Sequence, residues 1–198
     1  MNIIERLKKL ETESIERGIP ILGSLKGKFI LEKIKELKPK NILELGTANG
    51  YSGIILGNEK GKLTSVEINP IIAKEAKENF KKFRIKAEII IDDGVKFVKK
   101  LASSKRNYFD LIFIDFAKKS YIKVLEDCIK LTKKDGVIIA DNLHFKECKD
   151  FKKAVLNHPQ LKTEIVKIAD WSNMLDSFNI EFSNFILLIL IVTGISNC

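Results

Sequence analysis

Apolar residues recur at helical spacing in two stretches near the start of the chain. Within residues 3–10, and again within 30–37, they lie three or four positions apart, which places them on one face of a helix. Gly18-Ile19-Pro20 interrupts the first pattern, and Pro39 ends the second. The pattern predicts two helices that form an N-terminal helical cap over residues 1–40.

The period changes from Asn41 onward, where short apolar runs alternate with longer amphipathic stretches. Such runs indicate buried strands, and the stretches between them indicate helices. Pro70 is expected to open one of these helices, because proline is favoured in the first turn. The expected strands are 41–45, 62–68, 87–91, 109–115, 136–141, 163–168 and 185–192, and the expected helices are 52–57, 70–83, 94–104, 121–132 and 145–158, with a loop over 169–184.

This alternation of strands and helices is typical of βαβ units and a parallel sheet. The runs 111–114 and 137–140 are continuously apolar, as strands covered on both faces require. The chain is therefore predicted to be an α/β protein with three layers, and its length of 198 residues favours a single domain, 1–198, with the sheet core over 41–198.

Composition narrows the class of protein. The first ten residues carry charges throughout, so no signal peptide is expected, and the longest apolar run, 185–192, is far shorter than the ~20 residues that cross a bilayer. Three cysteines without ligand-like spacing indicate reduced thiols rather than a disulfide scaffold or a zinc ribbon. A cytoplasmic protein without a membrane partner is expected.

The formal net charge of +9 leaves two interpretations open. A basic surface attracts polyanions such as nucleic acid. However, only four of the 35 basic residues are arginines, the residue that nucleic-acid sites favour. A generally lysine-rich composition explains the same charge without any function.

Carboxylates follow all of the first five expected strands. In an open parallel sheet, ligands bind beyond the carboxyl ends of the strands, so these side chains form the candidate site. Acids in such positions also cap the helix that follows, which is the alternative for each of them. The residues are Glu44, Glu67, Asp92 with Asp93, Asp115, and Asp141 with Asn142.

The loop after the first strand is rich in glycine. Gly46 and Gly50 would allow a ligand to approach the backbone, and their Gly-x-x-x-Gly spacing differs from the G-x-G-x-x-G of dinucleotide-binding proteins. Glu67 lies at the tip of the second strand, where a carboxylate can accept both hydroxyls of a ribose. Glu44 beside the loop suits a cationic ligand and repels a pyrophosphate.

Four segments together carry a family resemblance: ILELGTANGYSG, VEIN, FDLIFIDFAKKSY and GVIIADN. They resemble the class I S-adenosylmethionine-dependent methyltransferases. More narrowly, they are similar to the metal-dependent O-methyltransferases, a family that includes the catechol and caffeoyl-CoA enzymes and bacterial relatives acting on a transfer-RNA wobble uridine. The resemblance covers residues 15–170 and implies a Rossmann-like sheet of seven strands, mostly parallel with the last antiparallel, with the N-terminal helices over the cleft.

The resemblance also implies roles for individual residues. Lys118 matches the general base, and three residues match the ligands of a divalent cation, Mg²⁺ before Mn²⁺ or Ca²⁺: Asp115, Asp141 and Asn142. The residues implied to bind S-adenosylmethionine are Glu44, Gly46, Thr47, Gly50, Tyr51, Ser52, Glu67, Asp93 and Asp115.

Elementary chemistry agrees with this donor set. Carboxylate and amide oxygens are hard ligands for such cations, and a cation that holds two substrate oxygens lowers the pKa of the attacking hydroxyl. A lysine beside it can take the proton. His144 is a weaker ligand candidate, and Phe145 and Trp171 are candidates for stacking on a planar acceptor.

The chain departs from the family pattern at two places. The usual Asp-Ala-Asp-Lys run is Asp115-Phe116-Ala117-Lys118 here, so its second acid is absent and the pocket is more apolar. Trp171 replaces a glycine, and a longer apolar tail follows it.

These observations predict methyl transfer from S-adenosylmethionine to a hydroxyl oxygen of a small, catechol-like acceptor with help from a divalent cation, and they leave a homodimer open. The main alternative is methylation of a transfer-RNA wobble hydroxyuridine. Alternatives of another class are a nicotinamide-binding oxidoreductase and an inactive cofactor-binding module.

Overall fold

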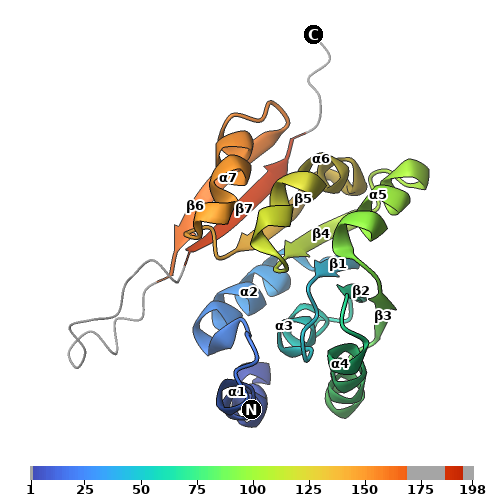
Figure 1. Cartoon of the computed structure of the whole chain (residues 1–198), viewed down its shortest axis with the longest axis vertical. Coiled ribbons are helices and arrows are strands. Elements are labelled where there is room, and N and C mark those ends of the chain that lie inside the picture. Colours follow the sequence, from blue (N-terminus) through green and yellow to red (C-terminus); the bar gives the residue numbers. More distant parts are fainter. Residues whose placement is uncertain (1, 169–185, 194–198) are drawn as a thin grey trace, which may run out of the picture.

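A seven-stranded sheet forms the centre of the computed structural model, which describes residues 2–168 and 186–193 (Figure 1). The strand order is β3-β2-β1-β4-β5-β7-β6. Only β7 runs antiparallel to its neighbours, β5 and β6. The sheet is therefore mostly parallel with its last strand reversed, as predicted. The strands are β1 (Asn41–Leu45), β2 (Lys62–Glu67), β3 (Ala87–Ile91), β4 (Phe109–Ile114), β5 (Thr132–Asp141), β6 (Leu161–Lys167) and β7 (Ile186–Val192).

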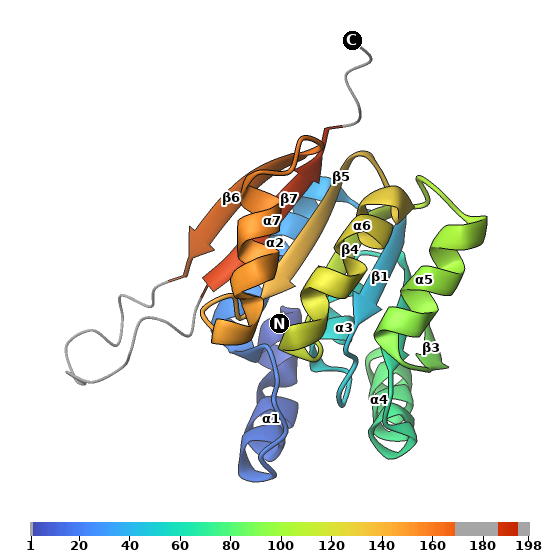
Figure 2. The ribbon, with the colours of Figure 1, turned by 45° about the horizontal axis from the view of Figure 1, so that its top comes forward.

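Helices cover both faces of the sheet and give the three predicted layers. Figure 2 shows α5, α6 and α7 on one face, with α2 and α3 behind the sheet. The helices are α1 (Ile3–Glu16), α2 (Gly23–Leu37), α3 (Tyr51–Leu56), α4 (Pro70–Phe83), α5 (Gly94–Ser104), α6 (Tyr121–Leu131) and α7 (Lys149–Leu156), with short 3₁₀ turns at Lys118–Ser120 and Lys146–Cys148.

The two faces of each strand belong to two separate apolar clusters. In β4, Leu111 and Phe113 pack with α1 to α4, whereas Ile112 and Ile114 pack with α5 to α7. All four side chains are fully buried. The continuous apolar run thus results from burial on both faces, as expected for an inner parallel strand.

Local sequence signals fix the ends of several helices. Asn2 and Glu5 form a reciprocal capping box at the start of α1. Asn69 caps α4, and Pro70 occupies the first turn. Both helices begin where the sequence predicts.

The start of β5 differs from the expectation. The strand begins at Thr132 rather than Gly136, because Thr132 pairs with Phe109 and an irregularity before Leu111 shifts the register. Asp135 adopts a left-handed conformation with φ 64° inside this irregular part.

The expected C-terminal strands are observed as β6 and β7, whereas the expected loop 169–184, with Trp171, lies outside the described residues. Among the helices that the structure describes, none is both long and apolar enough to span a membrane.

The inner position of β7 makes its apolar side chains important for stability. Leu188 is fully buried between Ala140 of β5 and Ile165 of β6, whereas Ile165 is 40% exposed. Leu188→Ala should lower the free energy of unfolding by about 2–5 kcal/mol through lost transfer energy and the cavity left behind. Ile165→Ala is the control and should cost under about 1 kcal/mol, because its side chain already contacts water. Urea titration measures both, and equal costs would contradict this placement of β7.

Candidate active site

A cavity of about 600 Å³ lies at the carboxyl ends of β1, β2 and β4. Its walls come from the glycine-rich loop after β1, the tip of β2, the segment after β4 and the linker between α1 and α2. The linker contributes Ile19, Pro20 and Ile21, which the predicted site did not include. The cavity therefore lies where the topology of an open parallel sheet places a ligand.

Gly46 turns the chain at the floor of this cavity. Its φ is 101°, and a Cβ atom at this position would lie 2.0 Å from the carbonyl oxygen of Asp115. Backbone hydrogen bonds join Gly46 to Val66 and Asp115 to Leu45, each 2.9 Å long. Only glycine allows β1 and β4 to end this close together.

Glu67 is in the cavity wall, as predicted. Its carboxylate accepts hydrogen bonds from the backbone amides of Ala48 at 2.9 Å and Asn69 at 3.0 Å. These two bonds fix the carboxylate at the tip of β2 and leave lone pairs for a ligand.

Glu44 lies under the loop rather than in the cavity wall. It is fully buried and accepts hydrogen bonds from the hydroxyls of Ser52 at 2.6 Å and Ser65 at 2.5 Å. Burial raises the pKa of Glu44 to about 8, against the opposite effect of the two serine hydroxyls. Its geometry is that of a support for the loop.

The hydroxyl groups of the loop are engaged inside the protein. Tyr51 donates to Glu11 of α1 at 3.1 Å, and the hydroxyls of Thr47 and Ser65 are 2.5 Å apart. Burial raises the pKa of Tyr51. Thr47, Tyr51 and Ser52 still line the cavity, but the Tyr51 hydroxyl points to the N-terminal helix.

Asp93 lies outside the residues that line the cavity and caps α5. Its carboxylate accepts a hydrogen bond of 3.0 Å from the amide of Lys96. This geometry agrees with the alternative that the acid caps the following helix. A contact between Asp93 and the cofactor stays a prediction.

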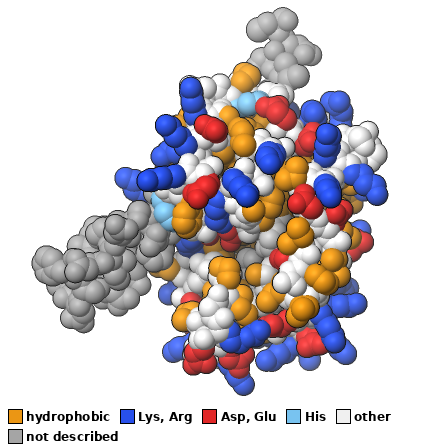
Figure 3. Space-filling model, viewed as in Figure 1, with side chains coloured by type: hydrophobic (Ala, Val, Ile, Leu, Met, Phe, Trp, Pro, Cys, Tyr) orange, Lys and Arg blue, Asp and Glu red, His pale blue; other side chains and the backbone are white. Residues whose placement is uncertain are grey.

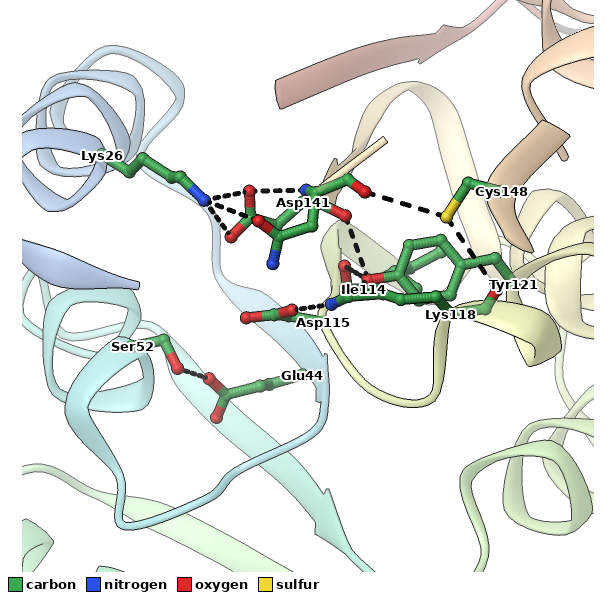
Figure 4. Close-up of polar contacts among 10 residues, drawn as sticks. Lys26, Glu44, Ser52, Ile114, Asp115, Lys118, Tyr121, Asp141 and Cys148 are labelled. Atoms are coloured by element: carbon green, nitrogen blue, oxygen red, sulfur yellow. Dashed lines mark hydrogen bonds and ion pairs between the residues drawn. The ribbon is translucent and has the colours of Figure 1, made fainter. Parts of the chain in front are cut away.

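Lys118 and Asp115 form an ion pair at the other end of the cavity (Figure 4). The ammonium donates to Asp115 Oδ1 and, at 3.0 Å, to the hydroxyl oxygen of Tyr121. Tyr121 in turn hydrogen-bonds to the carbonyl oxygens of Ile114 and Asp141. The end of β4, α6 and the end of β5 thus hold one amine at a fixed place.

Phe116 adds an apolar wall to this end of the cavity. Its ring stacks on Tyr121, with the ring centroids 5.6 Å apart. Phe145, also in the wall, packs against His144, with 4.2 Å between centroids.

Lys26 of α2 reaches Asp141, the last residue of β5, as Figure 4 shows, and also Asn142, the next residue. Its ammonium lies 2.7 and 2.8 Å from the two carboxylate oxygens of Asp141 and 3.0 Å from Asn142 Oδ1. Burial and the Asp115 charge raise the pKa of Asp141 to about 6, and Lys26 opposes them. The predicted site did not include Lys26.

This arrangement does not fit the predicted divalent cation. The oxygens of Asp141 and Asn142 that would hold the ion already accept from an ammonium, and Asp115 accepts from a second one. The cation stays a prediction from the sequence.

Comparison with known proteins decides the family. A model described as O-methyltransferase matches residues 2–177. The chain belongs to this family.

Two curated relatives illustrate the similarity to other O-methyltransferase family members. The chain is 30% identical over 150 residues to the tapetum-specific methyltransferase 1 of Arabidopsis thaliana, covering 70% of this chain and 63% of that protein. It is 30% identical over 135 residues to a catechol O-methyltransferase of Niastella koreensis, covering 65% and 61%. The chain therefore spans about six tenths of the length of these relatives.

Solved structures share the fold. The O-methyltransferase of Bacillus cereus in complex with SAH aligns with a TM-score of 0.78 at 20% identity, covering 96% of this chain and 90% of that one. TomG of Streptomyces achromogenes, in complex with SAM, aligns with a TM-score of 0.79 at 18% identity, covering 95% and 89%.

Gly46→Ala should destroy the cavity of this O-methyltransferase family member. The new Cβ collides with the Asp115 carbonyl, so the loop or the end of β4 must move. Calorimetry with S-adenosylhomocysteine should show at least a ~30-fold loss of affinity. Gly18→Ala is the control: φ is +64° there too, but nothing lies within 4 Å of its Cβ, so only the strain of about 1 kcal/mol applies. Unchanged binding by Gly46→Ala would contradict the role of this close approach.

Glu44 should make stability depend on pH. Its pKa is about 8 in the folded protein against 4.5 for an ordinary glutamate side chain, so the folded state binds more protons between these pH values. Its contribution is complete below about pH 4.5 and is lost as the pH rises to about 8, a change on the order of 3–5 kcal/mol. Urea titrations from pH 5 to 9 should show this decline in the parent protein and not in Glu44→Gln. The exposed Glu88→Gln is the control, and parallel curves for the parent protein and Glu44→Gln would contradict the shift.

Proposed function

We propose that the protein transfers a methyl group from S-adenosylmethionine to a hydroxyl oxygen of a small, planar, catechol-like acceptor. The observation that carries this proposal is one cavity with two chemically different ends. Glu67 and the glycine-rich loop form one end, and the Asp115–Lys118 pair with Asn142 forms the other. Membership of the O-methyltransferase family supports the reaction type.

The glycine-rich end fits the cofactor. The backbone at Gly46 leaves the approach open, and the fixed carboxylate of Glu67 can accept the two ribose hydroxyls. The Gly46-to-Gly50 spacing argues against a nicotinamide cofactor. S-adenosylmethionine supplies an electrophilic methyl group on a sulfonium and leaves as the neutral thioether S-adenosylhomocysteine.

The opposite end of the cavity provides the base that accepts the hydroxyl proton. As the acceptor oxygen bonds to the methyl carbon and the carbon–sulfur bond breaks, the hydroxyl proton passes to the amine of Lys118, which has first released its own proton to solvent. Asp115 Oδ1 and the Tyr121 hydroxyl oxygen hold the resulting ammonium in place. The presence of Lys118 with both of its partners argues against an inactive cofactor-binding module. The predicted divalent cation has no part in this step.

Apolar walls favour a small aromatic acceptor. Ile19 and Ile21 of the linker and Phe116, Ala117 and Phe145 line the cavity. Flat apolar side chains bury an aromatic ring well. The printed name of the Niastella koreensis relative, a catechol O-methyltransferase, is consistent with this class.

The basic residues are not gathered at the cavity. The cluster formed by Lys99, Lys100, Lys105 and Arg106 lies in and after the C-terminal half of α5, away from the N-terminus of α5, which follows the site end of β3. Figure 3 shows basic and acidic side chains interspersed over one face of the molecule. This distribution favours a small acceptor over transfer RNA, the second candidate. A homodimer and a cytoplasmic location stay predictions.

Glu67→Ala tests the cofactor end and the function together. Losing a charge-assisted pair of hydrogen bonds worth roughly 2–4 kcal/mol should weaken S-adenosylhomocysteine binding by about 30-fold or more. The exposed Glu88→Ala is the control and should bind as the parent protein does. Calorimetry measures the affinity, and NAD should give no heat with either protein. Methyl transfer to a panel of catechols should fall in parallel with affinity.

Two outcomes would contradict the proposal. Unchanged binding of S-adenosylhomocysteine by Glu67→Ala would remove the ribose assignment. The second outcome is that transfer RNA is methylated faster than any catechol and that the rate depends steeply on salt. For RNA, log kcat/KM should fall by about 0.7 for each phosphate contacted when log salt concentration rises by one unit. This result would replace the small acceptor by RNA. Charge reversal at the Lys99 to Arg106 cluster should then abolish the RNA reaction, and should leave a small-molecule reaction unchanged.

A further inference from the structure

The ammonium of Lys26 is enclosed by three oxygens at the end of β5. It lies 2.7 and 2.8 Å from the carboxylate oxygens of Asp141 and 3.0 Å from Asn142 Oδ1. The Lys26 side chain is 7% exposed and that of Asp141 is 1% exposed. Two of the three residues predicted to hold a divalent cation are therefore bound to a cation that belongs to the chain itself.

The charges of this site balance without any added ion. Among the side chains that the structure describes here, the carboxylates of Asp115 and Asp141 are matched by the ammonium groups of Lys118 and Lys26. A divalent cation binds where the ligands carry net negative charge. Adding two positive charges to a set without net charge would repel both ammonium groups at close range.

The fold holds Lys26 in this place. Gly27, the next residue, packs so closely that a Cβ atom there would lie 2.9 Å from Ile55 Cδ1 of α3 and 3.2 Å from Ile4 Cδ1 of α1. This contact fixes α2 against the rest of the protein and fixes the backbone that carries Lys26. Lys26 also lies near the N-terminus of α2, where the helix dipole disfavours a cation, so it depends on its oxygen partners.

We propose that Lys26 is the resident cation of the active site and that it takes the place of a divalent ion. Lys26 and a divalent cation exclude one another, because both need the same oxygens of Asp141 and Asn142. The inference rests on the proposed function for its role in catalysis, and on the geometry alone for its effect on metal binding.

Lys26 also determines which group Asn142 can offer to the cavity. An ammonium is only a donor, so the amide atom that it contacts must be the oxygen. The Asn142 side chain lines the cavity and has its amide nitrogen left for an acceptor. Lys26 is thus a positioning residue: it turns Asn142 into a hydrogen-bond donor for the acceptor oxygen, whereas a metal ligand would present its oxygen.

The deciding experiment measures Mn²⁺ binding to the full chain by electron paramagnetic resonance and calorimetry. Lys26→Met removes the ammonium, keeps a similar apolar stem and leaves the site with net negative charge. It should bind Mn²⁺ at least ~30-fold more tightly than the parent protein. Lys28→Met, an exposed position of the same helix, is the matched control and should not change the affinity. The double variant Lys26→Met with Asp141→Asn should lose this increase in Mn²⁺ affinity, because the carboxylate that would bind the ion is gone.

Measurements on the parent protein make the test independent of how the variant folds. Its Mn²⁺ binding should be weak, and its methyl transfer should persist in EDTA. In Lys26→Met with EDTA, the KM for the acceptor should rise while S-adenosylhomocysteine binds normally.

The inference would be overturned if the parent protein bound Mn²⁺ tightly and Lys26→Met did not increase that affinity. It would also be overturned if EDTA abolished the activity of the parent protein and Mg²⁺ restored it. If S-adenosylhomocysteine did not bind the parent protein, the proposed function would fail instead, and the Mn²⁺ titrations would still decide the competition.

Discussion

The backbone contact between Gly46 and Asp115 is the constraint on which the site depends. The ends of β1 and β4 approach so closely that even a methyl group at position 46 would overlap the Asp115 carbonyl. Two hydrogen bonds of 2.9 Å, from Gly46 to Val66 and from Asp115 to Leu45, continue the sheet into the two loops. The loop proposed to bind the cofactor and the side chains proposed to bind the acceptor therefore share one backbone support, which would keep the reacting atoms in line.

Buried polar groups then hold the N-terminal helices to this base. Glu11 of α1 accepts from Tyr51, and Ser14 accepts at 2.7 Å from Asn49 Nδ2, so α1 supports the glycine-rich loop from behind. Lys26 of α2 does the same for the end of β5. Because an unpaired polar group in these positions would cost free energy, the contacts fix one arrangement of the helices over the cavity.

Most of the fold could be predicted from the sequence, because strands that are buried on both faces consist of continuous apolar residues, as in 111–114. The strand-end carboxylates Glu67 and Asp115 were likewise predictable, because topology alone places them at one edge. The direction of individual side chains was not predictable from the sequence. Glu44 and the Tyr51 hydroxyl point into the protein interior instead of into the cavity. Lys26 was missed because its partners are 115 and 116 residues away in the chain. Its signal was present, since Lys26 falls four residues before Ile30 and eight before Ile34, on the buried face of α2.

The absence of the second acid after Asp115 is consistent with a site that contains Lys26. A carboxylate at position 117, in the cavity wall, would leave the set of two lysines and three acids with a net negative charge, which favours a divalent ion. With Ala117, the two carboxylates equal the two ammonium groups, and the buried Lys26–Asp141 pair avoids the cost of an unmatched charge. Phe116 stacks on Tyr121, whose hydroxyl oxygen accepts a hydrogen bond from the Lys118 ammonium of this set. An uncharged residue at position 117 and the internal ammonium of Lys26 are thus two parts of one electrostatic balance.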